Sequence, residues 1–244
     1  MNPTDLPVLL VCSVEQEAAP IRARLSEIRQ IEVASRVCVT GNLDGARVVL
    51  LVAGMGKTNA GHALGATLAH QRVRRMIGFG VAGAYRKSGL KPGEIALASC
   101  EIYGDEGVLT PAGWISSREI GIPLSESGGL TLYNEFPIDK DHLTWAERRL
   151  TGAGQEVVVG PFVTVSCCSG TADEGDAMAE RFNAICETME GAAYAHVAAL
   201  NQIPFLEVRG ISNLVEDRDL SAWRIHEAAM AAADAAATLV RSET

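Results

Sequence analysis

Short apolar runs alternate with helical segments along this chain, and this alternation is the feature that most constrains its fold. Residues 8–14 (VLLVCSV), 47–54 (RVVLLVAG) and 74–83 (RRMIGFGVAG) are near-continuous apolar runs, which are typical of buried strands. An Ala/Gly/Leu-rich segment with helical character, KTNAGHALGATLAHQ, separates the second run from the third. A strand, a helix and a strand in that order form a βαβ unit, which predicts an α/β fold whose sheet contains parallel strands.

The same pattern continues to the end of the chain, so we expect one domain spanning residues 1–244. From Glu17 onward, the spacing of Ile21, Leu25 and Ile28 predicts a helix. Further strands are predicted at 93–103, 155–168 and 204–212, with helices near 140–150, 174–183, 191–202 and from 222. Residues 104–139 are rich in Gly, Pro and Ser, and they predict a long loop over the sheet edge, where long loops are often functional.

The formal net charge of −9 restricts the class of partner. A nucleic-acid backbone or an anionic membrane needs a positive protein surface, so we expect neither as a partner. The longest apolar runs are also far shorter than a membrane-spanning helix requires. A small-molecule partner is the remaining expectation.

The six cysteines show no C-x-x-C spacing, and the N-terminus has no basic region before its apolar run. We therefore expect no signal peptide, and buried free thiols in a reducing cytoplasm. Cys167 and Cys168 are adjacent but have no His nearby at ligand spacing, which favours packing over a metal or redox centre. We expect no metal and no cofactor.

Polar or glycine-rich residues stand where five of the predicted strands end. They are Glu15 or Glu17, the turn GVAGA at 80–84, residues 166–169, Glu190 and Asn213. Each alone has a structural explanation, such as a carboxylate at a helix start or an amide in a turn. Because ligands of open α/β sheets bind outside the carboxyl ends of the strands, the convergence of five such ends favours a binding site.

One phosphate-binding motif is incomplete. Residues 51–58 (LVAGMGKT) end like a P-loop, but the motif requires Gly at its first position, where this chain has Leu51. The glycines more simply allow close backbone approach at a strand-to-helix turn.

The segment ETMEGAAYAHVAALNQIPFLEVRGISN resembles the signature of the nucleoside phosphorylase and nucleosidase superfamily. Three other segments extend this resemblance over most of the chain: VEQEA (14–18), GFGVAGA (78–84) and GEIALASCEIYGDEG (93–107) are similar to segments of methylthioadenosine nucleosidases. Within the superfamily, ISNLVEDRDLSAW and GPFVTVSCCSGT look most like the futalosine hydrolases. Those enzymes release hypoxanthine from futalosine in the alternative menaquinone pathway.

The resemblance implies a nucleoside phosphorylase-like fold, with a central mixed twisted sheet flanked by helices. It implies that Glu190 binds the ribose hydroxyls, Met189 packs against sugar and base, and Glu17 activates the attacking water. Cleavage of a purine N-glycosidic bond needs such groups because the sugar becomes oxocarbenium-like while the base departs. We expect the substrate-binding wall to be completed by Val81, Ala82, Gly83, Cys168 and Ser169.

Asn213 stands where the adenine-releasing nucleosidases carry Asp, a residue that can protonate purine N7. An amide has no such proton, but its C=O accepts from a protonated N7 and its NH₂ donates to a 6-oxo group. We therefore predict that Asn213 favours hypoxanthine over adenine as the leaving base, and we count it with Glu17 as catalytic. The group that supplies the N7 proton stays open.

Two departures weaken the assignment of the base pocket. Thr188 stands where the adenine nucleosidases carry a second carboxylate, and Cys167 and Cys168 stand near their base-stacking aromatic residue. Glu216 and Arg218 either meet the carboxylate-bearing tail of futalosine or form a self-neutralising surface turn.

The sequence also leaves functions besides futalosine hydrolysis open. A purine nucleoside phosphorylase would need an anion clamp near the GVAGA turn, where only Val81 and Ala82 offer side chains, and the charge of Glu17 would repel phosphate. A methylthioadenosine or aminodeoxyfutalosine nucleosidase and a nucleoside-sensing binding protein stay open as well. The resemblance also implies a homo-oligomer, in which residues 104–139 could close a neighbouring subunit's site.

Overall fold

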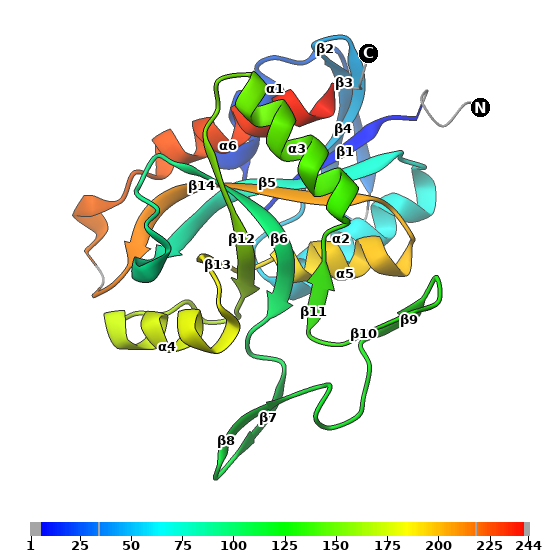
Figure 1. The fold of residues 1–244 in the computed structure, drawn as a ribbon. Coiled ribbons are helices and arrows are strands. Elements are labelled where there is room, and N and C mark those ends of the chain that lie inside the picture. The colour runs from blue at the N-terminus through cyan, green and yellow to red at the C-terminus, as the bar shows by residue number, and fades with distance from the viewer. Residues whose placement is uncertain (1–5, 34, 218, 242–244) are drawn as a thin grey trace.

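The apolar runs form the interior of a ten-stranded mixed sheet. The computed structural model describes residues 6–33, 35–217 and 219–241 (Figure 1). The strands are β1 (Val8–Cys12), β2 (Ser26–Val33), β3 (Arg36–Leu43), β4 (Ala46–Val52), β5 (Arg75–Tyr85), β6 (Ile95–Tyr103), β7 (Gly107–Thr110), β8 (Gly113–Ser116), β9 (Ser125–Ser127), β10 (Leu130–Leu132), β11 (Glu135–Pro137), β12 (Val157–Thr164), β13 (Cys186–Thr188) and β14 (Phe205–Val215).

Helices cover both faces of this sheet. They are α1 (Glu15–Arg22), α2 (Lys57–His70), α3 (Lys140–Gly152), α4 (Ala172–Phe182), α5 (Gly191–Leu200) and α6 (Ile225–Val240), with short 3₁₀ turns at Arg86–Ser88 and Leu220–Ala222. Helices α1, α3 and α6 pack together on one face, and α2 and α5 pack together on the other (Figure 1). The predicted α/β class, with a central mixed sheet flanked by helices, is confirmed.

Part of the sheet closes on itself. Strand β14 pairs with β5 in parallel and with β6 in antiparallel orientation. Strand β6 pairs with β12, β12 with β13, and β13 with β5, so these five strands form a ring. Of the five other strands of the sheet, β1, β4, β3 and β2 extend outward from β5 in that order, and β11 pairs with β6. The ring brings β13 and β14 to opposite sides of β5.

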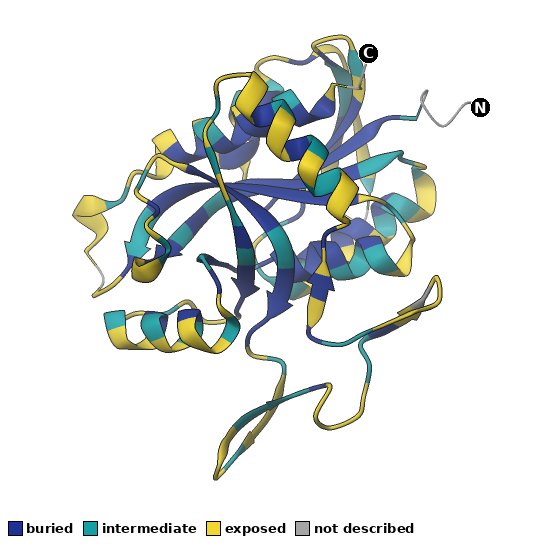
Figure 2. Ribbon diagram, in the orientation of Figure 1, coloured by how far each residue is buried: buried dark blue, intermediate teal, exposed yellow. Residues whose placement is uncertain are grey.

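The centre of the sheet is the core of the molecule. Every residue of β1 is inaccessible to solvent, and the dark strands of Figure 2 converge where β5 and β14 cross the molecule. Strands buried on both faces have continuous rather than alternating apolar sequences, which explains why β1, β4 and β5 could be predicted from apolar runs.

The predicted helix after Glu17 is too long. Helix α1 ends at Arg22, and residues Ser26–Val33 form β2 instead. Strand β2 lies at the sheet edge, and its side chains, including Ile28, are exposed except for the half-buried Val33. A strand exposed on both faces has no apolar alternation to identify it, and the spacing of Ile21, Leu25 and Ile28 imitates a helix there.

The predicted long loop at 104–139 contains short strands. It forms the hairpins β7–β8 and β9–β10, and β11 then pairs with the edge of β6. Three further features differ from the predictions. Strand β3 was not predicted, and no residue range was predicted for the strand end expected before Glu190, which is that of β13. Strand β14 does not end at Asn213 but continues to Val215 after a register shift between Ile211 and Asn213.

All six cysteines are free thiols, but not all are buried as predicted. Cys12, Cys38 and Cys186 are buried, Cys100 is half-buried, and Cys167 and Cys168 are exposed because they lie in the loop after β12. Within the described ranges, no helix combines the length and apolar character needed to cross a bilayer. Those ranges also contain no group of three or more His, Cys, Asp or Glu side chains arranged to hold a metal ion.

Candidate active site

A cavity of about 640 Å³ opens beside the ring of strands. Its wall comes from the segments that follow β1 and β12, from the second half of β5, and from β13 and β14. The predicted site residues that line it are Glu17, Val81, Ala82, Gly83, Cys168, Ser169, Met189, Glu190 and Asn213. Glu15 is not in the wall and instead forms an exposed ion pair with Arg22. The structure thus brings the predicted site residues together around one cavity.

Glu17 is only 2% exposed, and protein donors hold its two oxygens unequally. Oε2 accepts from Ser13 N (2.9 Å), Ser13 Oγ (2.8 Å) and Val14 N (3.1 Å). Oε1 accepts from Val81 N at 2.8 Å. A carboxylate offers about four lone-pair positions, two on each oxygen. Oε1 is therefore the oxygen with a position left for a water or a ligand.

Gly80 allows this carboxylate to lie against β5. A Cβ built on Gly80 would clash with Glu17 Oε1 and would lie 2.7 Å from Arg209 Nη1. Any larger residue at this position would displace both charged groups, so the glycine is required by close approach.

Glu190 precedes α5 and points toward the turn before α2. Its Oε1 accepts from Gly56 N at 2.8 Å, and its Oε2 lies 4.0 Å from Arg209 Nη2. Burial raises the pKa of Glu190 above its ordinary value, and the nearby Arg209 guanidinium opposes that rise. The turn that resembled a P-loop therefore supplies a backbone donor to a carboxylate.

Arg209 is the cation of this site and was not predicted. It is 1% exposed, pairs with Glu207 at 2.7 Å and donates to Val81 O at 3.2 Å. Its Nη2 has no hydrogen-bond partner among the described residues. The guanidinium stands between Glu17, Glu190 and Glu207 and reduces their mutual repulsion.

A second layer of carboxyl groups lies behind this cation. A Cβ built on Gly191 would contact both Glu101 and Glu207, so the two carboxyl groups approach the same point. Neither oxygen of Glu101 has a hydrogen-bond partner in the part of the chain that the structure describes. Burial raises the pKa of Glu101 far above its ordinary value, and the neighbouring Glu207 adds to this rise.

Asn213 is half-buried in the cavity wall. Its Oδ1 accepts from Ser212 Oγ at 2.7 Å, and its Nδ2 donates to Leu214 O at 2.9 Å. An amide can accept twice and donate twice, so each end keeps one hydrogen-bonding position. The two contacts fix the orientation of the amide along the strand.

Glu187 is a wall residue that sequence reasoning missed. It is 4% exposed, and its carboxyl group accepts from Ser169 N at 2.9 Å and from Ser169 Oγ at 2.8 Å. Its position beside Thr188 and Met189 in the quoted ETMEG segment was the available signal. The register that turns it into the cavity depends on β13, a strand of three residues that sequence patterns do not reveal.

The outer part of the cavity combines polar and apolar side chains. Glu216 lines it, whereas Arg218 lies outside the described residues. Thr188 shares a hydrogen bond with Thr164 at 3.1 Å and so is tied to β12. The outer wall also contains the apolar side chains of Val14, Met55 and Trp223, which suit an uncharged part of a ligand.

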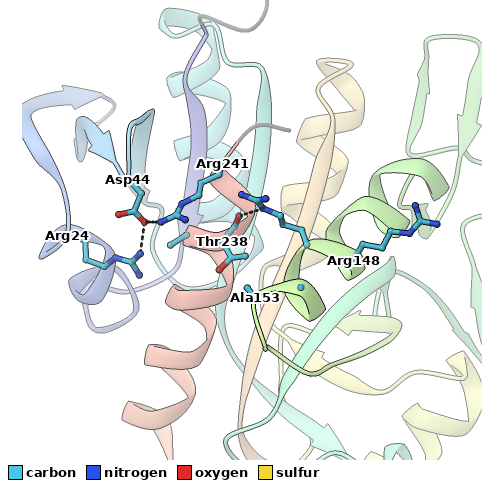
Figure 3. Close-up of a pocket in the computed structure, with 9 residues that line it drawn as sticks. Arg24, Asp44, Arg148, Ala153, Thr238 and Arg241 are labelled. Atoms are coloured by element: carbon cyan, nitrogen blue, oxygen red, sulfur yellow. Dashed lines mark hydrogen bonds and ion pairs between the residues drawn. The ribbon is translucent and has the colours of Figure 1, made fainter. Parts of the chain in front are cut away.

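A second cavity of about 410 Å³ shares no wall residue with the first. It lies between the C-terminal ends of α3 and α6, and four arginines line it (Figure 3). Arg24 and Arg241 both pair with Asp44, at 2.8 and 3.1 Å, and Arg149 donates to Thr238 O. Cations are favourable at helix C-termini, so Arg24, Arg149 and Arg241 are explained by their contacts with α6 and Asp44.

Comparison with protein families identifies the fold's relatives. Residues 7–242 match the model of the phosphorylase superfamily. The chain belongs to the phosphorylase superfamily. A similar protein is the futalosine hydrolase of Thermus thermophilus, 36% identical over 204 residues that cover 82% of this chain and 84% of the relative. A 5'-methylthioadenosine/S-adenosylhomocysteine nucleosidase of Mycobacterium bovis is 30% identical over 229 residues, 84% of each chain.

Two solved structures share this architecture. The S-adenosylhomocysteine nucleosidase of Streptococcus pyogenes, in complex with 5-methylthiotubericidin, superposes with a TM-score of 0.82 at 22% identity and covers 98% of this chain and 97% of that chain. The futalosine hydrolase of Helicobacter pylori gives a TM-score of 0.82 at 16% identity, with 97% of each chain covered. At these identities the likeness concerns the fold.

Proposed function

We propose that this member of the phosphorylase superfamily is an N-glycosidase that hydrolyses futalosine to hypoxanthine and dehypoxanthine futalosine. The 36% identity to a futalosine hydrolase over most of both chains supports this proposal. The cavity supports it as well, because the carboxylates of Glu17 and Glu190 and the amide of Asn213 lie on separate segments of its wall. A reaction at the anomeric carbon needs groups on the ribose, water and base sides of the bond.

The two carboxylates have different tasks in this proposal. Glu190 accepts hydrogen bonds from the ribose hydroxyls, with Met189 beside the sugar and base. Glu17 Oε1, which accepts from a single backbone amide, takes the proton of the water that attacks the anomeric carbon. Arg209 lies 4.0 Å from Glu190 and close to Glu17. Its positive charge offsets the repulsion between these two carboxylates in one small cavity. General bases of this kind typically contribute about 10²- to 10⁴-fold in rate.

The choice of leaving base rests on the amide of Asn213. Its free C=O position can accept from a protonated N7, and its free N–H can donate to a 6-oxo group. An adenine would turn its 6-amino group toward the amide NH₂ and leave donors unpaired at this half-buried position. Each unpaired group costs about 1–3 kcal/mol. We therefore favour a 6-oxopurine over the 6-aminopurine that a methylthioadenosine nucleosidase cleaves.

Water is favoured over phosphate as the nucleophile. Arg209 is a cation in the wall, but Glu207 pairs with it at 2.7 Å and Glu190 and Glu17 flank it. An incoming phosphate would meet these carboxylates at close range. We also propose that residues 1–244 act as one catalytic domain in a homo-oligomer, in a reducing cytoplasm, with residues 104–139 near a neighbour's site.

The test is release of free base from futalosine, inosine and methylthioadenosine, followed by chromatography in phosphate-free buffer and then with phosphate added. We expect hypoxanthine from futalosine without phosphate and poor release of adenine. Turnover only with phosphate would make the protein a phosphorylase. Binding of nucleosides without release of any base would support a sensing protein.

A further inference from the structure

Two adjacent thiols are exposed in the wall of the larger cavity. Cys167 and Cys168 belong to the loop between β12 and α4, and both line the cavity of about 640 Å³. The other cysteines are buried or half-buried: Cys12, Cys38, Cys100 and Cys186. The exposure of the pair contradicts the packing role expected from the sequence. Because solvent access and thiolate formation control the reactivity of a cysteine, this pair presents the most accessible thiols of the chain.

The loop is anchored on both sides of the pair. Ser166, directly before it, donates its backbone N–H to Asp105 Oδ2 at 2.7 Å. Ser169, directly after it, donates its N–H and its hydroxyl to the two oxygens of Glu187, at 2.9 and 2.8 Å. The other oxygen of Asp105 pairs with Lys57 Nζ at 2.7 Å, which ties the first anchor to α2. These contacts keep the two thiols at the cavity wall.

The cavity wall around the thiols is negatively charged. It includes the exposed carboxylates of Glu216, Asp217 and Asp219. Among the described wall residues, Arg209 is the only cation, and Glu207 pairs with it at 2.7 Å. The wall therefore attracts a cationic reagent and repels an anionic one.

We propose that Cys167 and Cys168 form a covalent modification site for small cationic disulfides, and that the group added there closes the cavity to nucleosides. A thiolate of the pair attacks one sulfur of the disulfide, whose S–S bond breaks while a new S–S bond to the protein forms. The other half of the reagent leaves as a thiolate and takes up a proton from solvent, to which the cysteine gave its own. The cysteine is oxidised, the released half is reduced, and excess thiol reverses the exchange.

This inference rests on the proposed binding of nucleosides in the cavity and adds a control of that binding. The competing explanation is that the pair is exposed without any effect on the cavity. A group added to the pair would then leave nucleoside binding intact. If the added group enters the cavity, modification and nucleoside binding exclude each other, so a bound nucleoside slows the modification.

The experiment is treatment of the full chain with cystamine, a cationic disulfide, or with dithiodiglycolate, an anionic one. We expect mass spectrometry to find an added cysteamine group on the peptide that contains Cys167 and Cys168. Cystamine should react faster than dithiodiglycolate by about 10-fold or more at low salt, and added salt should reduce this difference. Calorimetric titration with futalosine, inosine and methylthioadenosine should show that treatment abolishes nucleoside binding and that dithiothreitol restores it.

Two variants identify the reacting thiols. The double variant with Cys167→Ser and Cys168→Ser should take up no cysteamine group, and treatment should leave its own nucleoside affinity unchanged. Cys100→Ser is the matched control, because it removes a half-buried thiol on β6 and should respond to cystamine as wild type does. Loss of binding that persists in the treated double variant would overturn the inference, since another group would be responsible.

Three other results would also overturn the inference or separate it from the proposed function. Equal rates for the two disulfides would reject the preference for a cationic reagent. An added group on the pair with unchanged nucleoside affinity would reject control of the cavity, while base release from futalosine would leave the proposed function standing. Nucleoside binding that modification abolishes, without release of any base, would support the modification site and reject the hydrolase.

Discussion

The two oxygens of Glu17 illustrate how single residues set the chemistry of this cavity. Three donors occupy Oε2, and one backbone amide occupies Oε1. The oxygen that faces fewer donors is the one that can receive a proton from water. The same carboxyl group is therefore both a fixed part of the wall and a base.

Replacing Glu17 by Gln should separate binding from turnover. The amide is close in size and lets the nucleoside enter, but it cannot take a proton, so we expect kcat to fall about 10²- to 10⁴-fold. Nucleoside affinity, measured by titration, should change little. Glu15→Gln is the matched control, since Glu15 lies outside the wall and pairs with Arg22. Unchanged turnover in Glu17→Gln would remove Glu17 from the mechanism.

The functional groups that follow strand ends could be predicted from the sequence. Glu17, Glu190 and Asn213 were predicted because polar residues after apolar runs stand out, and because they match a superfamily motif. Arg209 and Glu187 were missed because each lies within a buried strand. Whether such a residue faces the cavity or an ion pair depends on strand register, which local sequence does not encode.

Elements buried on both faces were the easiest to predict. Strands β1, β4 and β5 and helix α2 follow directly from the apolar runs and the segment between them. Strand β2 escaped prediction because solvent covers its side chains, and β13 because three residues show no period. The pairing of β14 with both β5 and β6 is a long-range choice that no local pattern specifies.

Strand β5 should tolerate no side chain at Gly80. A methyl group there would meet Glu17 and Arg209, and misplacement of a catalytic group by about 1 Å can cost 10²-fold in rate. We expect Gly80→Ala to lower kcat/KM for futalosine by about 10²-fold or more.

The matched control for this variant is Gly61→Ala in α2. A Cβ at Gly61 has no neighbour within 4 Å, and Ala favours a helix over Gly by about 1 kcal/mol. Gly61→Ala should therefore keep its activity and a melting temperature at or above that of wild type. Full activity in Gly80→Ala would show that Glu17 does not act from its present position.

The whole molecule carries an excess of buried acid. Glu101, Glu187, Glu190 and Glu207 are all buried, and burial raises the pKa of each above its ordinary value. A carboxyl group with a raised pKa in the folded state binds more protons there than in the unfolded state. Its stabilisation is complete below the unfolded pKa and is lost as the pH rises through the folded pKa.

The melting temperature should therefore fall as the pH rises from about 5 to about 8, above the ordinary Glu pKa of about 4.3. The formal net charge of −9 acts in the same direction through self-repulsion. Differential scanning calorimetry across this range tests the expectation.

Glu101→Gln provides the comparison, because it removes an ionisable group whose oxygens have no partner among the described residues. Its melting temperature should depend less on pH than that of wild type, with the largest gain at the alkaline end. A gain of 1 kcal/mol corresponds to about 2–4 °C in a chain of this size. If the melting temperatures of wild type and Glu101→Gln depend on pH in the same way, Glu101 does not cause the loss of stability at alkaline pH.

The β7–β8 hairpin projects from the body of the molecule in Figure 1. Trp114 anchors it by packing edge-on against Phe182 of α4 at 5.5 Å, while Leu109 on β7 is 83% exposed. A lone two-stranded ribbon is only marginally stable in water. The amide protons of the β7–β8 hairpin will therefore exchange with deuterium by local opening, long before those of the central strands. A partner that covers the hairpin will slow this exchange, so the exchange rate reports directly on such a contact.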